Sequence, residues 1–245
     1  MIKLATAAIP LLAGAISSCI GVVSDDNVDM KVGEDVTQSV QVEEFTRLAV
    51  AGPYEVVVMP GKEISIEAEG PANVIQYTDF SVEDGRLRIR PRKNDGSSIR
   101  WDGDASTLIR ITSPSLRGAS IAGSGFIQID QVTGDSFDGD VAGSGDLRIQ
   151  NLKVASADFD IAGSGDIRAN GSAERFSIEI AGSGSFENPE LNAQEADVSI
   201  AGSGDVAANV TRTVAVSIAG SGDVNITGGA KCTVSKVGSG DVNCS

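Results

Sequence analysis

Residues 196–226 read ADVSIAGSGDVAANVTRTVAVSIAGSGDVNI, and the tetrapeptide Ala-Gly-Ser-Gly occurs in this stretch twice. The whole chain of 245 residues holds six copies of the tetrapeptide and a seventh in which Val replaces Ala. The copies begin at Ala122, Ala142, Ala162, Ala181, Ala201, Ala219 and Val237. A repeat of near-constant length, here 18 to 20 residues, is typical of a solenoid.

The residues between the tetrapeptides alternate between apolar and polar side chains. Ala196, Val198 and Ile200 precede one copy, and Val224 and Ile226 follow the next. A period of two indicates short strands with one buried face, and glycine suits the corners between them because it adopts positive φ without strain. We therefore predict an all-β fold, a single-stranded parallel β-helix of 18–20-residue coils with Gly-Ser-Gly corners.

The last two copies place two cysteines in the same register. Cys232 aligns with Val214 and Cys244 with Ile226, both at inward positions, and Lys236 takes the inward place of Ile218. A Lys there suits a final coil whose open end faces water. We interpret residues 231–245 as a C-terminal cap closed by a Cys232–Cys244 disulfide in an oxidising compartment, the alternative being two free thiols.

The N-terminus has the features of an export signal. Lys3 precedes the apolar run of residues 4–16, which has the length of a signal-peptide core, so residues 1–18 are assigned as the signal peptide. Residues 16–19, Ile-Ser-Ser-Cys, resemble a bacterial lipobox, and a lipid on Cys19 would explain the unpaired third cysteine. The alternative is cleavage after residues 13–15, Ala-Gly-Ala, which would give a soluble secreted or periplasmic protein.

Residues 19–41 are acidic with little apolar periodicity, which indicates a flexible tether. The β-helix domain is expected over residues 42–245. Residues 42–118 would form irregular opening coils, in which Ala51-Gly52-Pro53 is a degenerate corner, and residues 119–230 the regular repeats.

Three features together resemble the bacterial head GIN domain family, whose members are classed as autotransporter adhesins. They are residues 45–58 (FTRLAVAGPYEVVV), residues 85–89 (GRLRI) and the repeated Gly-Ser-Gly-Asp. The resemblance covers about residues 42–244. It implies an exported β-helical domain, often on lipoproteins or envelope proteins, and the family has no agreed catalytic residues.

Composition excludes several classes of function. The chain has no His, so it has no His-based triad or His-ligated metal site. With 19 Lys and Arg against 34 Asp and Glu, its net charge of −15 disfavours nucleic-acid binding. We assign no cofactor, no metal, no catalytic residues and no membrane contact beyond the lipid anchor.

An Asp follows the corner in five of the seven copies. These residues are Asp146, Asp166, Asp205, Asp223 and Asp241. Stacked carboxylates could hold Ca²⁺. The alternative, which we favour, is that each accepts hydrogen bonds from corner N–H groups in an Asx-type turn.

Two further groups are candidate ligand-binding residues. Arg86, Arg88 and Arg90 would share an outer face and could contact an anionic polymer, or else pair with Glu67 and Glu69 on a neighbouring strand. In the irregular stretch of residues 91–107, Trp101 lies beside Asp102 and Asp104. This arrangement could bind a sugar, or Trp101 could plug the opening coils.

These observations favour an exported, lipid-anchored, non-catalytic module that binds a polysaccharide, an envelope component or a surface, on an outer-membrane lipoprotein facing the periplasm or the cell surface. The alternative is an envelope scaffold or signalling lipoprotein that binds a protein partner. A polysaccharide lyase or hydrolase is a third hypothesis, and it rests on fold analogy alone.

Overall fold

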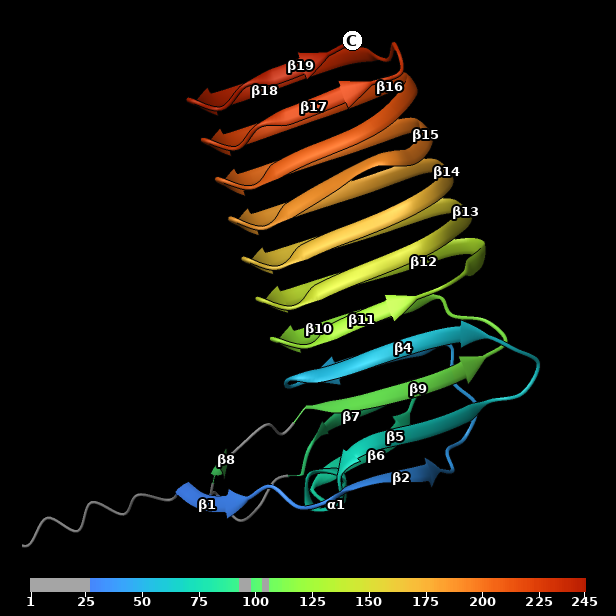
Figure 1. Ribbon diagram of the computed structural model, residues 1–245. Helices are drawn as coiled ribbons and strands as arrows, with labels where there is room; N and C mark the ends of the chain where they lie inside the picture. Colours follow the sequence, from blue (N-terminus) through green and yellow to red (C-terminus); the bar gives the residue numbers. More distant parts are fainter. Residues whose placement is uncertain (1–26, 93–97, 103–105) are drawn as a thin grey trace, which may run out of the picture.

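The computed structural model describes residues 27–92, 98–102 and 106–245. Residues 118–245 form a stack of parallel coils (Figure 1). Its strands are β10 (Gly118–Gly123), β11 (Phe126–Ile129), β12 (Val132–Gly143), β13 (Asp146–Gly163), β14 (Asp166–Gly182), β15 (Ser185–Gly202), β16 (Asp205–Gly220), β17 (Val224–Thr227), β18 (Lys231–Gly238) and β19 (Val242–Cys244). Each pairs with its equivalent in the next coil, for example Ala162 with Ala181. The predicted β-helix is therefore confirmed.

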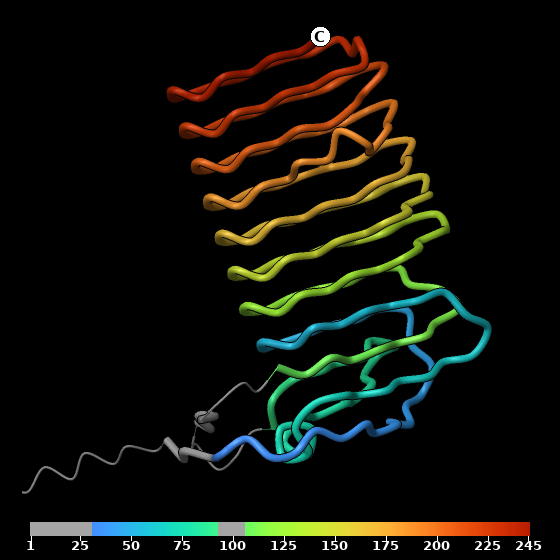
Figure 2. The backbone as a smooth tube through the Cα atoms, in the orientation of Figure 1, coloured from blue at the N-terminus to red at the C-terminus, as the bar shows by residue number. Residues whose placement is uncertain are grey.

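Each coil has two sheet faces joined by the Gly-Ser-Gly segment. We call the β10 face the sheet that contains β6, β7, β3, β10, the parts of β12–β16 that precede each Gly-Ser-Gly, and β18. We call the β11 face the sheet that contains β2, β5, β9, β4, β11, the parts of β13–β16 that follow each Gly-Ser-Gly, β17 and β19. Figure 2 shows the coils following one another with almost no offset.

Glycines stack at the chain reversals because the coils approach closely there. Gly182 and Gly202 are paired in register and have φ of +138° and +140°, a region that favours glycine. The N–H of Ser203 donates to the carbonyl of Gly182 over 2.8 Å. A Cβ on Gly202 would collide with that same carbonyl oxygen.

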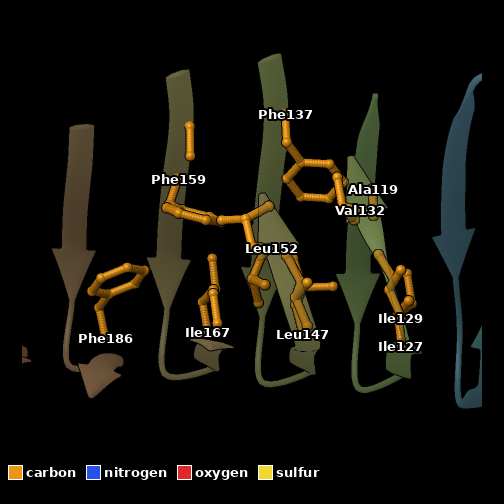
Figure 3. Packing of buried hydrophobic residues seen from close by; sticks show 14 of the residues in the cluster. Ala119, Ile127, Ile129, Val132, Phe137, Leu147, Leu152, Phe159, Ile167 and Phe186 are labelled. Atoms are coloured by element: carbon orange, nitrogen blue, oxygen red, sulfur yellow. The ribbon is translucent and has the colours of Figure 1, made fainter. Parts of the chain in front are cut away.

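The core fills the space between the two faces. Phe137, Phe159 and Phe186 come from β12, β13 and β15 and point inward among Leu and Ile side chains (Figure 3). The ring centres of Phe137 and Phe159 are 6.4 Å apart, and those of Phe159 and Phe186 are 5.0 Å apart. A continuous apolar column therefore stabilises coils that individually could not bury a core.

The opening half, in contrast, is not a series of coils in chain order. Its elements are β2 (Asp35–Val40), β3 (Arg47–Ala51), β4 (Tyr54–Pro60), β5 (Ser65–Pro71), α1 (Ala72–Gln76), β6 (Thr78–Glu83), β7 (Arg86–Pro91) and β9 (Thr107–Ser113). β3 and β4 form a coil that pairs in parallel with β10 and β11, and the next layer outward is β7 and β9. β2, β5 and β6 run antiparallel to their neighbours, unlike the coils that we expected.

This arrangement closes the end of the solenoid. A last parallel coil would leave its inward side chains in water, whereas the antiparallel strands and α1 cover them. Val74 and Ile75 of α1 are both buried. The remaining strands, β1 (Asn27–Lys31) and β8 (Ser98–Asp102), form a separate parallel pair.

Candidate functional site

The Asp column follows the chain reversals on the β11 face. The Oδ1 atom of Asp166 accepts from the N–H of Ser185 over 3.1 Å, and that of Asp223 accepts from the N–H of Asp241 over 2.8 Å. Asp146 and Asp205 bind the next coil in the same way. Because each donor belongs to the following coil, these bonds are not the Asx-type turns that we favoured; they hold successive coils together. Within the described residues, no cluster of three or more acidic or Cys side chains could hold a metal ion.

Phe126 takes the place of Asp in this column, and it is half-buried on the outside of the β11 face. The guanidinium carbon of Arg148 lies over its ring, 5.2 Å from the centre, in cation–π geometry. One coil further along, Arg168 lies 3.4 Å from a carboxylate oxygen of Asp166. We call Phe126, Arg148, Asp166 and Arg168 the Phe126 platform.

The platform combines an apolar ring with side chains that donate and accept hydrogen bonds on a flat sheet. Such a combination suits the apolar face and hydroxyl groups of a sugar ring. Our sequence analysis did not include Phe126 or Arg148 among the candidates. The signal was present, because Phe126 interrupts a column of Asp residues.

The predicted Arg stripe lies on β7, with Arg86, Arg88 and Arg90 on its outer side. Arg88 pairs with Glu83 over 2.5 Å and Arg90 with Asp79 over 3.1 Å, both on β6. The expected partners Glu67 and Glu69 were therefore wrong. They lie on β5 in the other sheet, where Glu69 pairs with Arg110 over 2.5 Å. The ligand-binding role of the stripe stays a prediction.

An acidic group that sequence analysis missed lies on the β10 face. Asp138 pairs in register with Asp158, and Asp140 with Asp160. Burial, and then the neighbouring carboxylates, raise the pKa of Asp140, Asp158 and Asp160. The signal was an Asp-x-Asp pattern repeated one coil later.

Other candidates lie partly or wholly outside the described residues. Cys19, the signal peptide and Asp104 are outside them. Trp101 and Asp102 belong to β8 by their backbone, where they pair with Met30 and Lys31, but their side chains are not described. The sugar-binding reading of this segment stays a prediction.

Two hollows lie away from the platform. One of about 560 Å³ lies beside Phe45, Lys62 and Ile64 at the opening end. The other, of about 330 Å³, lies over Ser199 and Ser217 on the β10 face. Both are open to solvent, and acidic residues line each of them: Glu44 and Glu63 the first, and Glu179 and Asp197 the second.

The disulfide predicted at the far end is present. Cys232 and Cys244 are joined, with their Cα atoms 6.6 Å apart, and the bond links the two faces of the terminal coil. Lys236 is exposed, and its ammonium group donates to the carbonyl of Gly240. No helix within the described ranges is long and apolar enough to cross a bilayer.

The fold and its surface together define a class of protein: a β-solenoid whose two regular sheet faces carry polar side chains on their outer sides. Residues 44–230 match the family described as "Putative auto-transporter adhesin, head GIN domain". The chain belongs to this family, so the resemblance seen in the sequence is confirmed. Family and disulfide together indicate a location outside the cytoplasm.

Solved structures agree in fold. A protein from Bacteroides fragilis described as an adhesin superposes with a TM-score of 0.82 at 24% identity, over 88% of this chain and 100% of that chain. Another protein described as an adhesin, from Parabacteroides distasonis, superposes with a TM-score of 0.72 at 20% identity, over 89% of this chain and 100% of that chain. A Parabacteroides distasonis protein described as lipid-binding superposes with a TM-score of 0.71 at 23% identity, again over 89% of this chain and 100% of that chain. No curated protein matches the chain.

Proposed function

We propose that the protein is an exported, non-catalytic module that binds an extended polysaccharide along its β11 face, with the Phe126 platform as the principal contact. The observation that carries the proposal is an outward aromatic ring stacked with Arg148 on a flat sheet. Membership of an adhesin family supports a role in attachment.

The β-helix suits a polymer because equivalent side chains recur at about 4.8 Å from coil to coil. Along the β11 face, Asn225 and Asn243 continue the hydrogen-bonding surface, with Nδ2 of Asn243 3.1 Å from Oδ1 of Asn225. Many weak contacts along one chain add up through multivalency. The proposal needs no catalytic group.

We further propose that Cys19 carries a lipid and that residues 19–41 tether the domain to the outer membrane. Such an anchor would attach the solenoid at its opening end, since β2 and β3 lie there. A soluble secreted form is the alternative. Metabolic labelling with a radioactive fatty acid separates them, because the wild-type chain would incorporate label and Cys19→Ser would not.

Binding is tested by passing the folded protein through gels that contain envelope or extracellular polysaccharides, and by measuring polymer length afterwards. We expect retardation of the wild type and no shortening of the polymer. Phe126→Ala removes the stacking surface and should weaken binding about tenfold, equivalent to about 1.4 kcal/mol. Ser199→Ala, on the β10 face, is the matched control and should bind like the wild type.

Equal retardation of Phe126→Ala and the wild type would refute the platform. Shortened polymer would refute the non-catalytic assignment. Absence of binding to every polysaccharide tested would favour the alternative function, a scaffold for a protein partner.

A further inference from the structure

The β10 face carries an antisymmetric pattern of charge. β10 itself has two small residues on its outer side, Gly118 at its first position and Ser120 at its third. On one side of it lie β3 and β7 with arginines, and on the other β12 and β13 with aspartates. The face therefore changes sign across β10, and beyond the arginines it carries acidic residues again, Glu83 and Asp79 on β6.

The pattern holds residue by residue along one row. Strand register aligns Arg86 with Arg47, Arg47 with Gly118, Gly118 with Asp138, and Asp138 with Asp158. Counted outward from Gly118, the first residue on each side is Arg47 or Asp138, and the second is Arg86 or Asp158. Each cation is matched by an anion at the same distance from the centre.

The neighbouring row repeats the pattern two residues further along each strand. Arg88 and Asp160 both lie two strands from Ser120, on opposite sides of it. Between them are Ala49 and Asp140. The row beyond is flat, because it consists of exposed alanines at every Ala-Gly-Ser-Gly: Ala122, Ala142, Ala162 and Ala181.

We propose that two copies of this protein pack through their β10 faces about a two-fold axis that runs parallel to β10. Rotation about such an axis reverses the order of the strands and keeps the position along each strand. It therefore places Arg86 opposite Asp158 of the other copy, and Arg88 opposite Asp160. Contacts of this kind are made twice in one isologous dimer.

Packing distances and charge both agree with this dimer. Packed sheets lie about 10 Å apart, which a long Arg and a short Asp can span. On the axis, the side chain of Arg47 crosses Gly118 to reach Asp138, whereas Ser120 is small and half-buried. Within one copy, Asp138 is paired with Arg47 over 2.7 Å, and Arg88 with Glu83 of β6 over 2.5 Å. Asp158 and Asp160 lie near other carboxylates, and Asp158 also lies near Arg175 of its own copy. Arginines of a second copy would relieve the remaining repulsion. This inference is independent of the polysaccharide proposal, which concerns the β11 face.

Charge reversal tests the pairing. The first variant is Arg86→Glu with Arg88→Glu, and the second is Asp158→Arg with Asp160→Arg. By light scattering at about 20 mM salt we expect the wild type at twice the chain mass, falling towards one chain at about 500 mM because surface charges are screened. Each variant alone should be a monomer, since like charges then face each other.

Mixing the two variants is the decisive step. In the mixed pair every Glu faces an Arg and every Arg an Asp, so the mass of a dimer should return. Lys153→Glu with Arg212→Glu makes the same change of charge at exposed positions outside the two rows, and should remain dimeric. Circular dichroism melts show that each variant is folded before its mass is interpreted.

Three outcomes would overturn the proposal. They are a wild type that is a monomer at both salt concentrations, a mixture of the two folded variants that stays monomeric, and a control variant that dissociates like the others. The last outcome would mean that net charge, rather than this face, governs association.

Discussion

Replacement of Gly204 by Ala tests whether stacked glycines set the spacing between coils. Gly204 is buried in the reversal between β15 and β16. A Cβ there would meet the carbonyl oxygen of Gly184 in the preceding coil and lie 2.7 Å from Cγ2 of Ile180. Because the first obstacle is backbone, the coils themselves have to move apart.

Two further variants separate the crowding from the backbone conformation. Gly202→Ala introduces both crowding and backbone strain. A Cβ there would lie 3.0 Å from the carbonyl carbon of Gly182, and φ is +140°. Gly85→Ala, in the turn between β6 and β7, introduces backbone strain alone, because φ is +69° and a Cβ there would have no atom within 4 Å. The three positions therefore differ in known ways.

Crowding in a packed interior costs about 1–3 kcal/mol, against which Ala gains about 0.4–1 kcal/mol by restricting the unfolded chain. We expect a net loss of about 1–2 kcal/mol for Gly204→Ala. For Gly202→Ala, backbone strain adds about 1–3 kcal/mol to the loss of stability from crowding. For Gly85→Ala, backbone strain acts alone, and we expect a loss of about 1 kcal/mol. A loss of 1 kcal/mol corresponds to roughly 2–4 °C in a chain of this length.

Urea unfolding followed by far-UV circular dichroism measures these losses. The expected order of destabilisation is Gly202→Ala, then Gly204→Ala, with Gly85→Ala the mildest or equal to it. If Gly204→Ala unfolds at the wild-type urea concentration, the coils can separate without cost. Glycine would then be present for the turn alone, and the argument from close stacking would be refuted.

Three other changes follow from single observations. Reduction of the Cys232–Cys244 bond, whose two cysteines are separated by 12 positions in the sequence, should cost about 3 kcal/mol and expose the terminal coil to protease first, which mass spectrometry of the fragments detects. Asn188→Ala should cost about 1–3 kcal/mol in urea unfolding, because the buried amide of Asn188 bonds both the N–H of Ala169 and the carbonyl of Ile167. Asp160→Asn should raise the melting temperature of dilute protein at pH 7. Burial raises the pKa of Asp160 above its usual 3.8, so the folded state retains the proton and loses stability as pH rises through that window. Below pH 3.8 the gain should vanish, and a constant gain at all pH values would contradict this cause.

The regular half of the fold could be predicted because each position recurs. A residue in one coil has the same neighbours as its equivalent in the next, so alignment of Cys232 with Val214 and of Cys244 with Ile226 placed both cysteines inward. Sequence periodicity carries that information directly. Register placed the two cysteines, and the expected export to an oxidising compartment favoured a disulfide over two free thiols.

The opening half could not be predicted in the same way. A period of two reports which side chains are buried and is the same for parallel and antiparallel strands, so β5 and β6 looked like further coils. The error in the partners of the Arg stripe follows from this, because Arg90 pairs across an antiparallel hairpin with Asp79. The relative directions of these strands had to come from the structure.

The donors to the Asp column were missed for a related reason. Asx-type turns are local, whereas the carboxylate of Asp166 accepts from Ser185, 19 residues later. In a solenoid, the nearest backbone N–H in space belongs to another coil. Local turn rules therefore fail where the repeat brings coils together.

The two proposals together predict a bivalent adhesin. Packing through the β10 faces leaves both β11 faces in solvent, so a dimer presents two Phe126 platforms. Arg86→Glu with Arg88→Glu should then weaken retention on an immobilised polysaccharide at least tenfold, because avidity from two sites is lost. Its affinity for a short soluble oligosaccharide should equal that of the wild type, since each platform is intact. If both measurements fell together, the arginines would contact the sugar directly, and the binding surface would include the β10 face.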